Sequence, residues 1–130
     1  MTLDHIDIVL PWPDTMLFPN RRRGSFRKFQ PYIEAARRSG FHCARLALGR
    51  NTIRLGARNH VRLLFGMPDR RNRDLDGCVG AIKHYLDGIA QALGVDDRVF
   101  RPVLLDDCLD REKTGFVLVQ IRAGDSKEAA

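Results

Sequence analysis

The strongest pattern in the sequence is a stripe of apolar residues at helical spacing between residues 75 and 94. Apolar side chains recur every three or four residues, at Val79, Ile82, Leu86, Ile89 and Leu93. This spacing is typical of one face of an α-helix, and a glycine such as Gly94 is favoured directly after a helix ends. A strand-like segment precedes the stripe and another follows it. We therefore expect a helix that connects two strands.

The remaining segments complete an alternating series of strands and helices. Residues 5–10 and 60–65 alternate apolar and polar side chains, and residues 99–105 and 115–122 are also strand-like. A looser helical stripe runs from Pro31 to about Gly49 and is weakened by Gly40. A chain of 130 residues is the size of one ordinary domain. The sequence predicts a single α+β domain, a mixed sheet with two main helices, in the order β-α-β-α-β-β.

Positive charge is concentrated in the first part of the chain. Residues 1–74 hold 15 Lys and Arg against 6 Asp and Glu, whereas residues 75–130 hold 7 against 10. The formal net charge is +6, which suits a polyanionic partner such as DNA. We expect the first part of the chain to contact phosphate.

Other classes of protein are disfavoured by simple counts. The longest apolar runs are far shorter than the roughly 20 residues that span a bilayer, and acidic Asp4 and Asp7 stand where an export signal would be basic. The 3 cysteines show no CxxC spacing, which disfavours a disulfide framework and a zinc site. We expect a cytoplasmic protein with no membrane partner.

Three aspartates are candidates for a metal site. Asp74 and Asp76 flank one residue, so in an extended segment both side chains point to the same side. Asp97 follows the predicted helix, whose return toward the sheet could bring this third carboxylate close. Carboxylates hold Mg²⁺ or Mn²⁺, and the metal generates hydroxide for phosphodiester hydrolysis. Capping or pairing with neighbouring arginines is the alternative role of Asp74 and Asp76, with Asp76 a plausible N-cap. Asp96 is the alternative to Asp97.

Lys83 lies seven residues after Asp76 and therefore shares its helix face. It could stabilise the transition state or order the attacking water. The alternative is a surface ion pair with Asp87, four residues further on.

The segment Met67-Pro68-Asp69-Arg70-Arg71-Asn72-Arg73-Asp74-Leu75-Asp76 resembles the RusA family of Holliday-junction resolvases, whose signature is a Pro-Asp-Arg-rich loop running into Asp-x-Asp. Leu10-Pro11-Trp12-Pro13 and Gly94-Val95-Asp96-Asp97 resemble two further family segments, in family order. The family commonly has Asn after the second motif aspartate and Lys four residues beyond it, where this chain has Gly77 and Gly80. One inserted helical turn would place Lys83 in the family's lysine position.

The resemblance implies a RusA-like endonuclease domain over residues 1–122, followed by a polar tail over residues 123–130. It implies a homodimeric, Mg²⁺-dependent enzyme that nicks four-way DNA junctions symmetrically in phage-derived recombination and repair. The catalytic carboxylates would be Asp74, Asp76 and Asp97, with Lys83 assisting. We expect DNA contacts from Arg70, Arg71, Arg73, Arg21, Arg22, Arg23, Arg27 and Lys28, although a solvated loop is the alternative for the segment around residues 21–28. The alternatives for function are a branched-DNA-binding protein that does not cleave, and a nuclease for flaps or forks.

Overall fold

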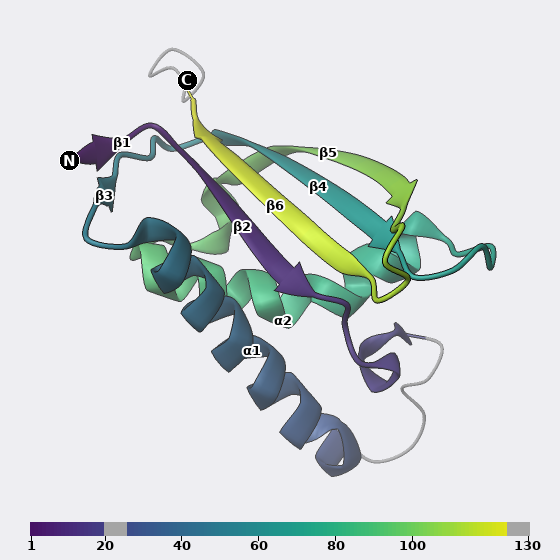
Figure 1. Cartoon of the computed structure of the whole chain (residues 1–130). Helices are drawn as coiled ribbons and strands as arrows, with labels where there is room; N and C mark the ends of the chain where they lie inside the picture. Colours follow the sequence, from purple (N-terminus) through teal and green to yellow (C-terminus); the bar gives the residue numbers. More distant parts are fainter. Residues whose placement is uncertain (20–25, 125–130) are drawn as a thin grey trace.

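The computed structural model describes residues 1–19 and 26–124 and contains one main sheet with two long helices. The sheet holds β2 (His5–Pro11), β4 (Asn59–Met67), β5 (Phe100–Leu109) and β6 (Phe116–Ala123), in the spatial order β2-β6-β4-β5. β4 and β5 run parallel, while β6 is antiparallel to both of its neighbours, β2 and β4. The predicted α+β class, the mixed sheet and the order β-α-β-α-β-β are confirmed (Figure 1).

Short elements surround this frame. β1 (Thr2–Leu3) and β3 (Thr52–Ile53) form a small parallel pair beside the sheet. The described residues also include two 3₁₀ turns, η1 (Thr15–Leu17) after β2 and η3 (Asp97–Val99) before β5. No helix in the described part of the chain is long and apolar enough to cross a membrane.

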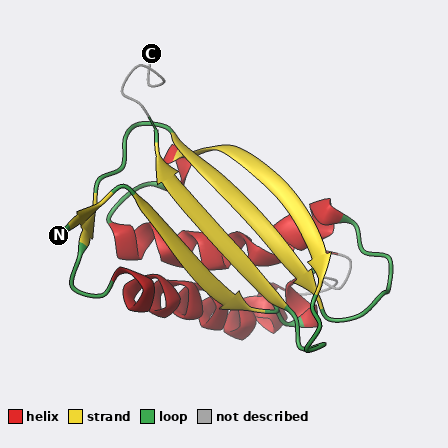
Figure 2. Cartoon of the chain, turned by 45° about the horizontal axis from the view of Figure 1, so that its top comes forward, coloured by secondary structure: helices red, strands yellow, loops and turns green. Residues whose placement is uncertain are grey.

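Both helices, α1 (Phe26–Leu48) and α2 (Leu75–Leu93), cover the same face of the sheet, and the opposite face is open (Figure 2). The alternation of β2 explains this asymmetry, because Ile6, Ile8 and Leu10 are buried under the helices while the residues between them are exposed. The core is the layer between the strands and the two helices, and the site residues lie at its margins.

The helices pack on each other with backbones almost in contact. A Cβ added to Gly40 of α1 would lie 2.1 Å from the Tyr85 carbonyl oxygen, and one added to Gly88 of α2 would lie 1.9 Å from the Arg37 carbonyl oxygen. The sequence indicated Gly40 only as a weak point in the first helix. Gly40 is needed for the packing of α1 on α2, because any side chain at this position would force the two helices apart.

The first helix begins earlier than predicted. Pro31 was expected in the first turn, yet α1 starts at Phe26 and Pro31 lies inside it. Proline inside a helix removes one intrahelical hydrogen bond, and α1 continues to Leu48 despite this loss. Arg21, Arg22 and Arg23 fall outside the described residues.

The direction of α2 fixes where its two ends lie. Because β4 and β5 are parallel, α2 must run back along the sheet from the end of β4 to the start of β5. Asp74 caps its first turn, and Gly94 ends it in the left-handed conformation at φ 71°. The segment before α2 and the segment after it therefore lie at opposite ends of the sheet.

Candidate functional site

The loop between β4 and α2 is held in shape by Asp69. Its carboxylate accepts hydrogen bonds from both terminal nitrogens of Arg73, at 2.7 and 3.1 Å. It also accepts the Arg71 backbone N–H at 2.9 Å and the Arg71 guanidinium at 3.3 Å. The Arg73 guanidinium is the main cause that holds the pKa of Asp69 well below its usual range. Asp69 thus orders the arginine-rich loop from within.

Arg73 connects this loop to the end of β2. Its guanidinium carbon lies 5.5 Å from the centre of the Trp12 ring, a cation–π distance, and only 15% of its side chain is exposed. Trp12 in turn packs at a tilt against Phe18. A cavity of about 600 Å³ lies here, bordered by Trp12, the loop and Asp74.

The two motif aspartates take different positions at the start of α2. Asp74 has extended backbone and is the N-cap, accepting the Asp76 backbone N–H at 3.2 Å. Asp76 lies inside the first helical turn. The expectation that Asp76 is the N-cap is therefore wrong. The argument from an extended segment also does not apply to Asp76, because helical backbone turns its side chain to another direction.

Asp76 borders a second cavity, of about 360 Å³, which runs between α2 and the outer strand β5. We call it the α2–β5 groove. It is lined by Asp76, Val79, Lys83 and Leu86 of α2, by Phe100, Val103 and Leu105 of β5, by Val61 and Leu63 of β4, and by Asp97. Asp76 and Lys83 thus share one face, as the spacing indicated.

Lys83 does not form the surface ion pair considered from the sequence. In the described part of the chain, the basic group beside Asp87 is His84, whose Nδ1 lies 3.6 Å from the carboxylate. Lys83 is exposed at the groove. Its positive charge partly offsets the other influences on the carboxyl group of Asp97, which together raise its pKa. Its ammonium is therefore free to meet a ligand in the groove.

Gly80, one turn before Lys83, lies close to Pro19. A Cβ at Gly80 would lie 2.8 Å from Pro19 Cγ, so a side chain at this position requires Pro19 to move. A Cβ added to Gly77 would meet no atom within 4 Å, so that position needs no such space. Any residue larger than glycine at position 80, a lysine included, is therefore sterically disfavoured in this chain.

Of the paired aspartates before β5, Asp97 is the one that faces the groove. Asp96 caps η3, accepting the Arg98 backbone N–H at 2.9 Å, and this bond is the main cause that lowers its pKa. The pKa of Asp97 is raised, first by its contact with the Asp96 carboxyl, then by burial and by the charge of Asp87. Asp97 is therefore surrounded mainly by negative charge, which a cation would offset.

The three predicted carboxylates do not gather within one copy of the chain. Asp76 stands at the start of α2, whereas Asp97 follows its end, and the helix between Asp76 and Leu93 is about 26 Å long at roughly 1.5 Å per residue. Among residues 1–19 and 26–124, no group of three or more possible ligands is close enough to hold a metal ion. The return of the helix carries Asp97 away from Asp74 and Asp76.

Asp107 is a carboxylate that the sequence reasoning missed. It pairs in register with Phe65, which is fully buried, so its side chain is on the helix-covered face of β5. The pKa of the Cys78 thiol is raised mainly by burial, with smaller contributions from Asp74 and Asp107. Asp107 therefore stands at the Asp74 end of the sheet. Continuing the alternation of Val103 and Leu105 by one step would have found it.

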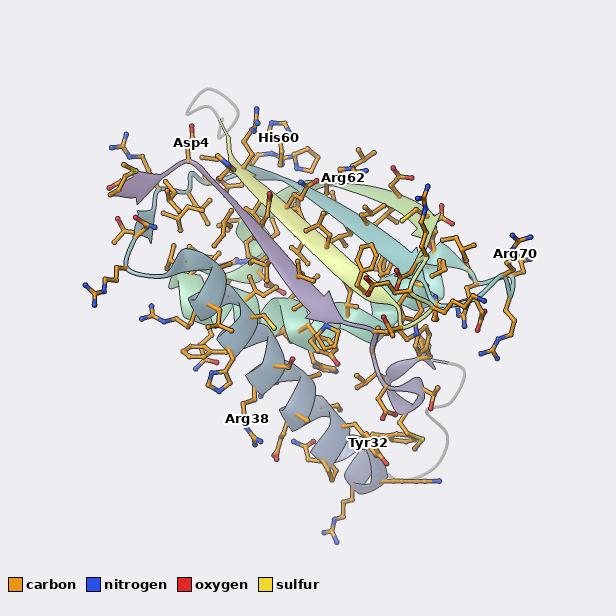
Figure 3. All side chains as sticks on the ribbon, viewed as in Figure 1. Asp4, Tyr32, Arg38, His60, Arg62 and Arg70 are labelled. Atoms are coloured by element: carbon orange, nitrogen blue, oxygen red, sulfur yellow. The ribbon has the colours of Figure 1, made fainter. Side chains whose placement is uncertain are left out.

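The predicted DNA-contacting residues differ in whether their side chains already bind another residue of the chain. Arg70 is exposed at the outer tip of the loop and points away from the sheet (Figure 3). Arg71 and Arg73 are bound to Asp69, as described above. Arg27 and Lys28 belong to the first turns of α1. Arg21, Arg22 and Arg23 lie outside the described residues.

Fold and site together define a single-domain α+β protein with a largely apolar groove that holds two aspartates and a lysine, near an arginine-rich loop. No protein-family model matches the chain. A protein of Xylella fastidiosa, described as an uncharacterized protein, is 34% identical over 109 residues, which cover 77% of this chain and 67% of that protein. The chain belongs to the same family as this Xylella protein.

Proposed function

We propose that this protein is a metal-dependent endonuclease that resolves four-way DNA junctions by paired nicks, acting as a homodimer. The observation that carries the proposal is that Asp76 and Lys83 line one groove directly beside the arginine-rich loop. The resemblance of residues 67–76 to the RusA signature supplies the junction as substrate. A dimer is proposed because symmetric nicking of a two-fold junction needs two equivalent sites.

Each part of the site has a proposed role. Asp74, Asp76 and Asp97 would hold Mg²⁺, or Mn²⁺ in its place, because hard divalent cations prefer carboxylate oxygens. The bound metal would supply a nucleophilic hydroxide and neutralise charge on the scissile phosphate. Lys83 would stabilise the same developing charge from the groove wall. Arg70, Arg71 and Arg73, with the basic residues before and within α1, would attract the DNA backbone.

A non-cleaving junction-binding protein is the second candidate. Two observations favour it: Gly80 against Pro19 leaves no lysine at the family's position, and the carboxylates of one copy lie at opposite ends of α2. A nuclease for flaps or forks is the third possibility, because nothing in the groove itself specifies four arms.

The test compares DNA binding and cleavage by the wild-type protein on a labelled four-way junction, a flap, a fork and a linear duplex, each with Mg²⁺ or Mn²⁺. We expect preferred binding of the junction and paired nicks in it. Tight junction binding without nicks in either metal would establish the binding protein instead. Faster cleavage of flaps or forks than of the junction would change the substrate.

A further inference from the structure

The face of the sheet that the helices leave open carries a pocket of about 410 Å³, which the proposed nuclease site does not use. We call it the open-face pocket. His60 and Arg62 project from this face of β4 (Figure 3). The pocket lies at the start of β4, whereas the arginine-rich loop follows the end of that strand. Its polar and basic lining residues are His5, Asp7, His60, Arg62, Gln120 and Arg122.

Three of these side chains form a basic row across the sheet. His5 of β2 and His60 of β4 are both in register with Arg122 of β6, the strand that runs between them. Residues directly opposite each other in antiparallel strands place their side chains on the same face, with Cβ atoms about 5 Å apart. All three side chains are exposed. The basic row therefore offers up to three positive charges to a single bound group.

The neighbouring row of the pocket satisfies its own charges. Gln120 Nε2 donates to the Asp7 carboxylate at 3.3 Å, and Gln120 Oε1 accepts an Arg62 N–H at 2.9 Å. The other terminal nitrogen of Arg62 donates to Asp106 at 3.1 Å. Both carboxylates are thus bound within this second row, and neither forms an ion pair with the basic row.

Arg122, in the middle of the basic row, has little negative charge beside it. Among the residues that the structure describes, no carboxylate forms an ion pair with Arg122. The pKa of Asp4 is lowered mainly by its hydrogen bond with His5, with a small contribution from the charge of Arg122, but Asp4 does not line the pocket. A guanidinium without a carboxylate partner suits a phosphate, which can accept two parallel hydrogen bonds from it.

The contact with Asp4 determines how His5 can bind an anion. His5 Nδ1 lies 2.9 Å from Asp4 Oδ1, and an ionised carboxylate only accepts hydrogen bonds, so Nδ1 carries a proton. The other nitrogen, Nε2, can then donate to an anion only if the ring takes up a second proton. That proton adds positive charge directly opposite Arg122, which is unfavourable on a sheet unless an anion balances it. Anion binding and proton uptake by His5 should therefore favour each other.

We propose that the basic row binds a phosphate group, held by the Arg122 guanidinium between the imidazoles of His5 and His60. The phosphate lies at the end of the pocket away from Asp7, whose carboxylate would repel it. A free phosphate-bearing molecule and a nucleic-acid backbone both present this group. The inference does not rest on the proposed nuclease activity, because the pocket is on the face opposite the helices and at the opposite end of the sheet from the arginine-rich loop (Figure 2).

The site is tested by titrating the protein with inorganic phosphate and following its backbone amides by NMR. We expect saturable shifts around the basic row, and Arg122→Gln should weaken binding at least about tenfold, as the loss of a charge-assisted hydrogen bond does. The matched control is Arg45→Gln, an equal change of charge at an exposed position of α1, on the other side of the sheet. His60→Gln, which leaves Arg122 in place, should also weaken binding. Shifts that do not saturate, or equal affinities of Arg122→Gln and Arg45→Gln, would overturn the site.

The coupling to His5 is tested with sulfate, which keeps the same charge between pH 6 and pH 8, whereas phosphate groups change charge in this range. The wild type should bind sulfate several-fold more tightly at pH 6 than at pH 8, because His5 donates from Nε2 only when protonated. His5→Gln should show a smaller difference between the two pH values. Equal pH dependence in both proteins would overturn the role of His5.

A short linear DNA duplex distinguishes the two sources of phosphate. Shifts of the same amides with the duplex, and a slope of log K against log salt that falls by about 1 in Arg122→Gln, would assign the group to a nucleic-acid backbone. Shifts with inorganic phosphate but not with the duplex would assign it to a free phosphate-bearing molecule. If neither ligand shifts these amides, the proposal is wrong. None of these outcomes depends on whether the protein cleaves DNA.

Discussion

Among single residues, Asp97 is a carboxylate whose charge is expected to lower the stability of the fold. Its carboxyl lies against that of Asp96 and near Asp87, and these neighbours and burial raise its pKa. The charged form is therefore disfavoured in the folded state. Asp96 has the opposite environment, since its carboxylate accepts the Arg98 N–H and its pKa is lowered. The two adjacent aspartates should respond to substitution in opposite ways.

We expect Asp97→Asn to unfold at the same temperature as the wild type or higher at pH 7, because the substitution removes a disfavoured charge. The difference should shrink as the pH falls through the raised pKa of Asp97, where the wild-type carboxyl becomes neutral. Asp96→Asn should unfold at a lower temperature at pH 7, and that loss should disappear at acid pH. Thermal unfolding followed by circular dichroism measures both. A lower unfolding temperature for Asp97→Asn than for Asp96→Asn would contradict this account.

Arg70 is the residue best placed to test the arginine-rich loop as a DNA contact. Its side chain is exposed at the loop tip, whereas Arg71 and Arg73 are tied to Asp69. Arg70→Ala should weaken junction and duplex binding alike and lower the slope of log K against log salt by about 1, the value for one lost phosphate contact. Fluorescence anisotropy across a salt series measures this. An unchanged slope would show that Arg70 lies off the DNA path.

At the scale of elements, the glycines of α2 differ in whether they lie against α1. Gly88→Ala would place a methyl group 1.9 Å from the Arg37 carbonyl oxygen and should destabilise the fold by roughly 1–3 kcal/mol, as overpacking does. Gly77→Ala meets no atom within 4 Å and should stabilise it by up to about 1 kcal/mol. Urea unfolding of both variants measures the difference. Equal effects would mean that helix propensity, and not the close approach, decides the outcome.

The loop before α2 should lose its order when Asp69 loses its charge. Asp69→Asn removes the carboxylate that holds Arg71 and Arg73, and Arg73 contacts the only tryptophan of the chain, Trp12. We therefore expect the fluorescence emission of Trp12 to shift to longer wavelength at pH 7. Asp106→Asn is the control. Asp106 of β5 accepts a hydrogen bond from Arg62 of β4, away from Trp12. An unchanged spectrum for Asp69→Asn would contradict the ordering role of Asp69.

The helices and strands could be predicted from the sequence because apolar residues recur at a different spacing in each kind of element. The stripe that ends at Gly94 marks α2, and the alternation through Ile6 and Ile8 marks β2. Two boundaries were missed for local reasons. Proline at position 31 indicated a helix start, although α1 begins at Phe26, and the polar pair Asp106-Asp107 hid the outer half of β5, which extends to Leu109.

The position of Asp97 depends on the whole molecule. Sequence spacing placed Asp76 and Lys83 on one helix face, and both do line the groove. It could not place Asp97, because that residue's distance from Asp76 depends on β4 and β5 being parallel neighbours. Parallel neighbours require a crossover, so the helix carries the chain to the far end of the sheet. The predicted carboxylates are therefore divided between the two ends of α2.

The most direct test of the account is the cleavage of a labelled four-way junction by the wild type, Asp76→Asn and Asp7→Asn, with Mg²⁺ and with EDTA. Asp7 is a matched carboxylate on the open face of the sheet, away from the groove. We expect paired nicks from the wild type and Asp7→Asn in Mg²⁺ alone, and intact junction binding without nicks from Asp76→Asn. Equal cleavage by Asp76→Asn and the wild type, or cleavage that persists in EDTA, would contradict the assignment of the groove as a metal-dependent nuclease site.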